Sequence, residues 1–133
     1  MKSKTKRFCI IDDDDVQVFI TQKMLEASGA STKDSILVYN DGKEAFDDLK
    51  SRFEENRELP DVILLDVNMP IWNGWNFLDE FNKINREKSI DVFMVSSSVS
   101  YKEVLKSQTY PNVFGFFSKP LNVNIIQTKM IHL

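Results

Sequence analysis

The chain has 133 residues, of which 42% are hydrophobic, so it is long enough to form one globular domain with a buried core. Its 17 basic and 20 acidic residues give a net charge of −3, which provides no general attraction to nucleic acid or to an anionic membrane. No apolar run reaches membrane-spanning length. The basic N-terminus, MKSKTKR, lacks the apolar segment of a signal peptide, so we interpret residues 1–5 as a solvated tail and predict a folded domain over 6–133.

The sequence contains a single cysteine, Cys9, which lies inside an apolar run. An internal disulfide is therefore impossible, and we interpret the thiol as a small core residue. This cysteine usage is consistent with a reducing compartment, and we predict a cytoplasmic location.

Five short apolar runs alternate with helical patterns along the chain. Continuous apolar runs are typical of strands that are covered on both faces, as in a parallel sheet. The predicted strands cover residues 8–11, 35–39, 62–65, 92–95 and 113–117. The alternation predicts a doubly wound α/β domain, with five parallel strands, five flanking helices and right-handed crossovers.

The helices between the strands are predicted from apolar residues at helical spacing. The fourth helix is weakly periodic, and the last is predicted over residues 122–133. The residues predicted to face the core are Val16, Ile20, Met24 and Ala27 before Gly29; Ala45, Leu49 and Phe53 after Gly42; Phe77, Phe81 and Ile84 after Gly74; and Val104 with Leu105.

Ligands of such sheets bind outside the carboxyl ends of the strands. The residues just past these ends are Asp12, Asp13, Asp66, Ser96 and Lys119. Three carboxylates offer hard oxygen ligands, which suit Mg²⁺. Without the metal, the carboxylates should raise one another's pKa, and Lys119 should oppose that shift.

The run Asp12 to Asp15 contains four successive carboxylates. Asp14 is predicted to be a helix N-cap, with Gln17 at capping-box spacing, and Asp15 falls in the first helical turn, where the dipole favours an acid. Each signal also has an ordinary structural interpretation. The run alone fits a solvated turn, Asp66 alone a cap, Lys119 a surface lysine, and Ser96 one hydroxyl in a serine-rich turn. Only their joint arrangement favours a site.

The order and spacing of four motifs resemble the receiver domain of two-component response regulators. The motifs are IIDD at 10–13, LLDVNMPIWNG at 64–74, MVSS at 94–97 and FFSKP at 116–120. The resemblance covers residues 6–133. It implies a flavodoxin-like fold and a stand-alone receiver, although a segment of a longer regulator would read identically.

The resemblance also implies a role for each site residue. Asp66 resembles the phospho-acceptor, which takes its phosphoryl group from a phosphohistidine on a histidine kinase or a histidine phosphotransfer protein. Asp12, Asp13, Asp66 and the backbone carbonyl of Asn68 resemble the Mg²⁺ ligands. Lys119 resembles the ammonium that neutralises phosphoryl oxygens, an arrangement that agrees with the demands of phosphoryl transfer for positioning and charge neutralisation.

Ser96 matches the switch hydroxyl of the family, and Phe116 matches the switch aromatic. Because Phe116 lacks the hydroxyl of the more common Tyr, its inward rotation would depend on filling space. Phosphorylation is expected to switch the face formed by the fourth helix, the fifth strand and the fifth helix, toward a downstream protein that the sequence does not identify. Asn68 and Ser98 are expected to tune the lifetime of the phosphoryl group.

Two further departures concern Asn73 and Asp15, which stand where Asp and Pro are common in the family. We interpret Asn73 as a turn residue able to adopt a left-handed conformation. Trp72 and Trp75 beside it are better explained by packing over the loop than by kinase docking. His132 is predicted to be a surface residue.

Two other classes of protein share part of this residue pattern. A phosphatase of the haloacid dehalogenase type also uses an aspartate nucleophile and Mg²⁺, but it carries a second acid two residues later, where this chain has Asn68. A pseudo-receiver that binds a partner constitutively predicts a missing acid or lysine, and none is missing. The chain is therefore predicted to be a phosphorylated signalling domain rather than an enzyme.

Overall fold

The fold is seen in a computed structural model that describes residues 6–84 and 89–131. The predicted tail at 1–5 and His132 lie outside the described residues. The strands are β1 (Phe8–Ile11), β2 (Ile36–Tyr39), β3 (Val62–Asp66), β4 (Asp91–Ser96) and β5 (Val113–Ser118). The helices are α1 (Asp15–Ser28), α2 (Gly42–Glu54), α3 (Gly74–Phe81), α4 (Tyr101–Ser107) and α5 (Val123–Ile125), with a 3-10 turn at Lys33–Ser35 and a π-helical turn at Ile126–Met130.

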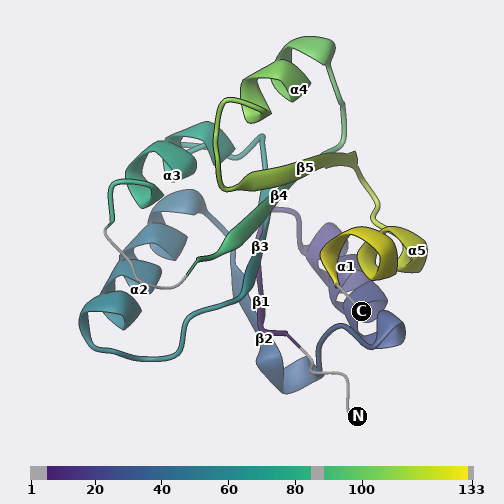
Figure 1. The fold of residues 1–133 in the computed structure, drawn as a ribbon, viewed down its shortest axis with the longest axis horizontal. Coiled ribbons are helices and arrows are strands. Elements are labelled where there is room, and N and C mark those ends of the chain that lie inside the picture. The colour runs from purple at the N-terminus through teal and green to yellow at the C-terminus, as the bar shows by residue number, and fades with distance from the viewer. Residues whose placement is uncertain (1–5, 85–88, 132–133) are drawn as a thin grey trace.

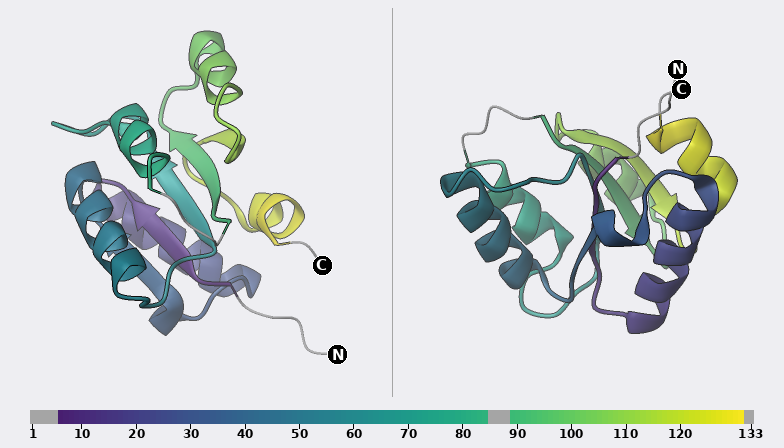
Figure 2. Two further views of the ribbon diagram at one scale, coloured as in Figure 1. Left: turned by 60° about the vertical axis from the view of Figure 1, so that its left-hand side comes forward. Right: turned by 90° about the horizontal axis from the view of Figure 1, so that it is seen from below.

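The five strands form one parallel sheet in the order β2-β1-β3-β4-β5. Helices α2 and α3 cover one face and α1 and α5 the other, while α4 lies beyond β5 (Figures 1 and 2). This arrangement confirms the predicted doubly wound fold. It also places the ends of β1 and β3 side by side in the middle of the sheet.

Alternate residues of the central strands point to opposite faces of the sheet and pack in two separate cores. Cys9 and Ile11 of β1 join the cluster under α2 and α3, whereas Phe8 and Ile10 join the cluster under α1 and α5. Every residue of β1 and β3 is buried, as predicted for strands covered on both faces. Burial raises the pKa of the Cys9 thiol, which agrees with its interpretation as a core residue.

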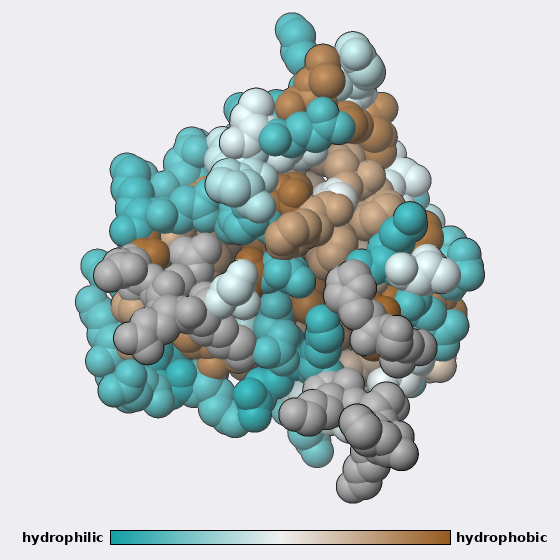
Figure 3. Space-filling model, in the orientation of Figure 1, coloured by the Kyte–Doolittle hydropathy of each residue, from teal (hydrophilic) through white to brown (hydrophobic). Residues whose placement is uncertain are grey.

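The prediction of full burial is wrong for β5, the edge strand next to β4. Its residues are half-buried or exposed, and the Phe114 side chain is 60% exposed. An edge strand has a partner on one side only, so fewer neighbours cover its faces. Figure 3 shows hydrophobic side chains gathered over α4 and β5, where Val99, Tyr101 and Leu105 are exposed together with Phe114.

Helix α1 begins as predicted, because the Asp14 side chain accepts hydrogen bonds from the amides of Val16 and Gln17. The predicted capping box does not form. The Asp14 amide donates instead to Asp12 Oδ1 at 2.9 Å, and among the described residues Gln17 Oε1 is the buried side-chain oxygen without a hydrogen-bond partner.

The predicted apolar stripe of α1 is also rotated from the real one. Val18 and Leu25 are buried, whereas the Val16 side chain is 66% exposed and Ala27 is exposed. Several apolar residues lie on both sides of the true stripe, so the spacing alone did not fix the buried face.

The last helix was predicted over 122–133 as one regular element. It is a short α-helix that changes at Ile126 into a π-helical turn ending at Met130. Ile126 and Met130 are both buried in the core under α1. The π-helical turn therefore keeps both side chains in the core that this segment shares with α1 and the sheet.

The loop between β3 and α3 is held tightly against the end of β3. A Cβ atom on Gly74 would lie 2.6 Å from the carbonyl oxygen of Asp66, so only glycine fits there without a shift. The Gly74 amide donates to the Val67 carbonyl at 2.8 Å. Glycine at this position therefore allows α3 to begin directly beside Asp66.

The prediction of a left-handed Asn73 is wrong. Asn73 is extended, with φ −77° and ψ 179°, and forms a capping box with Asn76 at the start of α3. The left-handed residue of this loop is Ile71, with φ 67° and a side chain that is 93% exposed. For a β-branched residue this conformation costs about 1–2 kcal/mol.

Candidate functional site

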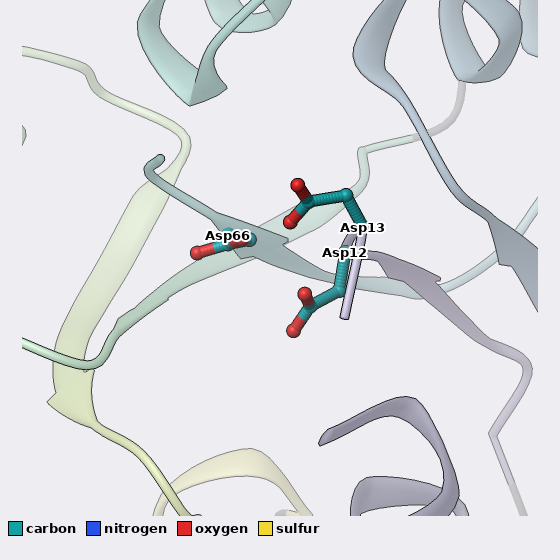
Figure 4. Close-up of side chains that lie close together, drawn as sticks. All are labelled: Asp12, Asp13 and Asp66. Atoms are coloured by element: carbon teal, nitrogen blue, oxygen red, sulfur yellow. The ribbon is translucent and has the colours of Figure 1, made fainter. Parts of the chain in front are cut away.

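Two buried carboxylates meet at the carboxyl end of the sheet. The register pairs Ile11 with Leu65, so the next residues, Asp12 and Asp66, lie at the same level on neighbouring strands. Each is only 5% exposed, whereas Asp13 is exposed. Ligand oxygens of the three aspartates lie within 4.8 Å of one another, and Figure 4 shows the side chains of Asp12 and Asp13, just past β1, and of Asp66, at the end of β3, extending toward the same side.

Lys119 supplies the positive charge at this site. Its Nζ lies 2.8 Å from Asp12 Oδ2 and 3.4 Å from Asp66 Oδ1, so one ammonium contacts both buried carboxylates. The Lys119 amide donates to the Ser96 carbonyl at 2.8 Å, which fixes the lysine just past the end of β5. The structure thus brings together Asp12, Asp13, Asp66 and Lys119 as predicted.

The electrostatics of the site follow from its burial. Burial, followed by the charge of Asp12, raises the pKa of Asp66 to about 7, although Lys119 and a hydrogen bond from the backbone amide of Asn68 act in the opposite direction. Burial lowers the pKa of Lys119, but its hydrogen bonds and charge interactions with Asp12 and Asp66 outweigh this effect and raise the pKa. This confirms for Asp66 the prediction that a neighbouring carboxylate raises the pKa and that Lys119 opposes the rise.

The donor set fits a hard divalent cation. Carboxylate oxygens from Asp12, Asp13 and Asp66 are the ligand type that Mg²⁺ prefers, and the exposed Asp13 leaves room for water on one side. The hydrogen bond from the Asn68 amide to Asp66 places the backbone of Asn68 next to this cluster. A divalent cation would offset the carboxylate repulsion that raises the pKa of Asp66.

Ser96 is the last residue of β4 at this end of the sheet, and Ser98 lies on the loop that follows. The Ser96 hydroxyl is fully buried; it donates to the Ser98 carbonyl at 2.8 Å and accepts from the Ser98 amide at 3.2 Å. The Ser98 and Asn68 residues are exposed. Phe116 on β5 is half-buried and packs against the core cluster under α2 and α3.

The two tryptophans near the site are engaged in packing, as the sequence indicated. Trp75 is 8% exposed and stacks on Tyr110, with Lys106 Nζ 4.7 Å from its ring centre. The Trp72 ring lies 5.5 Å from that of Phe46. Sequence reasoning missed the left-handed Ile71, because a β-branched residue gives no signal for a positive φ.

A family model described as "Response regulator receiver domain" matches residues 8–131. The chain belongs to this family. It is therefore a receiver domain, a signalling domain of two-component systems. Among the described residues, no helix is both long enough and apolar enough to cross a lipid bilayer.

The receiver shares its sequence pattern and fold with several known proteins. It is 31% identical over 118 residues to the sensor histidine kinase CheAY of Helicobacter pylori, a match that covers 89% of this chain but 14% of that protein. The crystal structure of a two-component response regulator from Cytophaga hutchinsonii is 25% identical, with a TM-score of 0.85 and 96% of each chain covered.

A further similar structure is that of the response regulator Rcp1 in its Mn²⁺-bound form. It is 26% identical, with a TM-score of 0.72, and the match covers 92% of this receiver and 89% of that chain.

The raised pKa of Asp66 predicts an unusual pH dependence of stability. Because the folded state binds this proton more tightly than the unfolded state, the native protein should lose stability as the pH rises from about 4 to about 7. Asp66→Asn removes this effect, so its stability advantage over the native protein should grow by about 1–3 kcal/mol between pH 5 and pH 8. Urea unfolding with a chelator present measures the difference.

Asp34→Asn, which removes an exposed acid far from the site, is the matched control for the loss of one charge. Equal stability differences for Asp66→Asn at both pH values would contradict the raised pKa of Asp66.

Proposed function

We propose that Asp66 accepts a phosphoryl group from a phosphohistidine of a histidine kinase or a histidine phosphotransfer protein. The observation that supports this role is that Asp66 ends the central strand β3, is buried beside Asp12 and lies within reach of the Lys119 ammonium. Such a carboxylate lies at the carboxyl end of the sheet, next to groups that can neutralise phosphoryl oxygens.

The proposed transfer forms one bond and breaks another. An oxygen of Asp66 attacks phosphorus, the bond from phosphorus to the imidazole nitrogen breaks, and the histidine ring keeps the electron pair of that bond. The product is an acyl phosphate on Asp66. Lys119 is already 3.4 Å from Asp66 Oδ1, so its ammonium can follow the phosphoryl oxygens with little movement.

Mg²⁺ is the proposed cofactor, held by Asp12, Asp13, Asp66 and the carbonyl of Asn68. When bound, the ion supplies charge neutralisation for the phosphoryl oxygens and favours the ionised carboxylate that must attack. The clustered oxygens support this proposal, as does the existence of a Mn²⁺-bound form of the similar regulator Rcp1.

The proposed partners are a histidine kinase or phosphotransfer protein as donor and an unidentified downstream protein as target, within the cytoplasm. The similarity to a segment of the histidine kinase CheAY supports a phosphohistidine donor. No nucleic acid or membrane is proposed as a direct partner, because the net charge of −3 gives no general attraction to either.

The proposed switch begins at Ser96. Its hydroxyl now bonds the Ser98 carbonyl, and a phosphoryl group on Asp66 would offer stronger acceptor oxygens. Rotation of the hydroxyl would release the loop that leads into α4, a helix of which only Ser107 is buried. Phe116 would then move with this segment by filling space, and the surface of α4, β5 and α5 would change.

Acetyl phosphate with Mg²⁺ should add one labile phosphoryl group to the intact protein, as measured by mass spectrometry. Asp66→Asn and chelation should each abolish the adduct, and Lys119→Met should slow its formation by about 10²-fold. Asp15→Asn, in the same aspartate run but outside the site, should behave like the native protein. An adduct that persists on Asp66→Asn would disprove the assignment of the acceptor.

Asn68 and Ser98 are proposed to set the lifetime of the phosphoryl group, because both are exposed at the mouth of the site. Leucine at either position should exclude the attacking water and lengthen the lifetime by about three- to tenfold, while phosphorylation is retained. Asn124→Leu, on α5, is the matched control. Unchanged decay rates in both site variants would exclude a role for these side chains.

Phosphorylation should change hydrogen exchange over residues 97–108, because the loop after Ser96 and α4 have few buried side chains to hold them. Amides of α2 serve as the internal reference, since this helix is anchored by buried Ala45 and Leu49. Equal exchange in 97–108 before and after phosphorylation would rule out the proposed switch.

A further inference from the structure

Ile71 has an apolar side chain that is almost entirely outside the core. It is 93% exposed and adopts a left-handed conformation that strains a β-branched residue. Asparagine or glycine would adopt this conformation more easily. A strained residue with almost no buried surface contributes little packing in return, so its side chain is expected to act on something outside the chain.

The surface around Ile71 is hollowed on both sides. One hollow of about 650 Å³ separates it from α2 and is lined by Asp41, Glu44 and Asp47, among others. A second of about 290 Å³ lies toward α3 and is lined by Trp72, Asp79 and Glu80, among others. Ile71 borders both hollows, so it forms a ridge between them. We call this region, residues 41–51 and 71–80, the α2–α3 surface.

The charges of this surface are mainly negative. Lys43 pairs with Asp47, Lys83 with Glu80, and Arg52 with Asp48, whereas the described residues provide no salt bridge to Asp41, Glu44 or Asp79. Lys43 also lies 5.6 Å from the centre of the Trp72 ring. The hollows beside the apolar ridge therefore have an excess of carboxylates.

We propose that the α2–α3 surface binds a partner protein through a short amphipathic segment that carries apolar side chains flanked by Lys or Arg. The apolar side chains would cover Ile71 and Trp72, and the basic ones would meet the carboxylates of α2 and α3. This surface meets the α4 side where Trp75 and Asp79 contact Tyr110, and its charge pattern exists without phosphorylation. The proposal therefore goes beyond the phosphoryl-transfer function and does not depend on it.

The test uses a defined probe, a 14-residue helical peptide with Leu at helical spacing on one face and Lys at the other positions. NMR titration of the ¹⁵N-labelled protein should show shifts confined to 41–51 and 71–80. Raising the salt from 50 to 300 mM should weaken binding at least threefold, because the charges are exposed. A peptide with Glu in place of Lys should not bind.

Ile71→Asn is the decisive variant, because asparagine tolerates the left-handed conformation while removing the apolar side chain. We expect a higher urea midpoint than in the native protein and at least a tenfold loss of peptide affinity. Phe114→Asn, which removes another exposed apolar side chain from β5, should leave peptide binding unchanged.

Three outcomes would overturn the proposal. The first is peptide shifts over α4 and β5 in place of the α2–α3 surface, and the second is native affinity in Ile71→Asn. The third is a lower urea midpoint for Ile71→Asn than for the native protein. This result would show that the isoleucine side chain stabilises the folded receiver itself.

Discussion

The contact of one ammonium with two buried carboxylates is the interaction on which the site depends. Asp12 and Asp66 lie at the ends of adjacent central strands, where the parallel sheet leaves no other strand between them. Lys119 reaches them from β5, past the end of β4. Asp66 is paired with Val95 of β4, and the next residue, Ser96, is fully buried and small, so the lysine can pass beside it.

The ammonium neutralises only part of the negative charge of the two carboxylates, so the site can still bind a cation. Burial and the nearby charge of Asp12 outweigh the effect of the single ammonium, so the pKa of Asp66 is raised to about 7. A divalent cation or a phosphoryl group with its cation would complete the charge balance. The buried carboxylates therefore lower the folding stability of the receiver, and a bound cation would stabilise them. Such a loss of stability is common at functional sites.

Much of the site could be predicted because it follows from a rule of topology. Residues that directly follow buried strands in a parallel sheet must meet at one edge, and Asp12, Asp66 and Lys119 do so. Local geometry was less predictable. The Asp14 amide found a partner in Asp12, which left Gln17 out of the predicted capping box. No propensity scale assigns the left-handed position to Ile71 in preference to Asn73.

That misassignment has a physical cause in the loop as a whole. Gly74 is pressed against the backbone of Asp66, and the Asn73–Asn76 capping box fixes the start of α3. The chain must therefore make its remaining turn earlier, and the strain falls on Ile71.

Asp66 and the exposed Ile71 are consequently joined by one short, tightly held segment. A protein bound at Ile71 would contact the loop that directly follows Asp66, while the exposed apolar side chains of α4 and β5 remained open. The geometry of this loop thus allows one partner to be bound next to the proposed acceptor while another contacts the proposed switch surface.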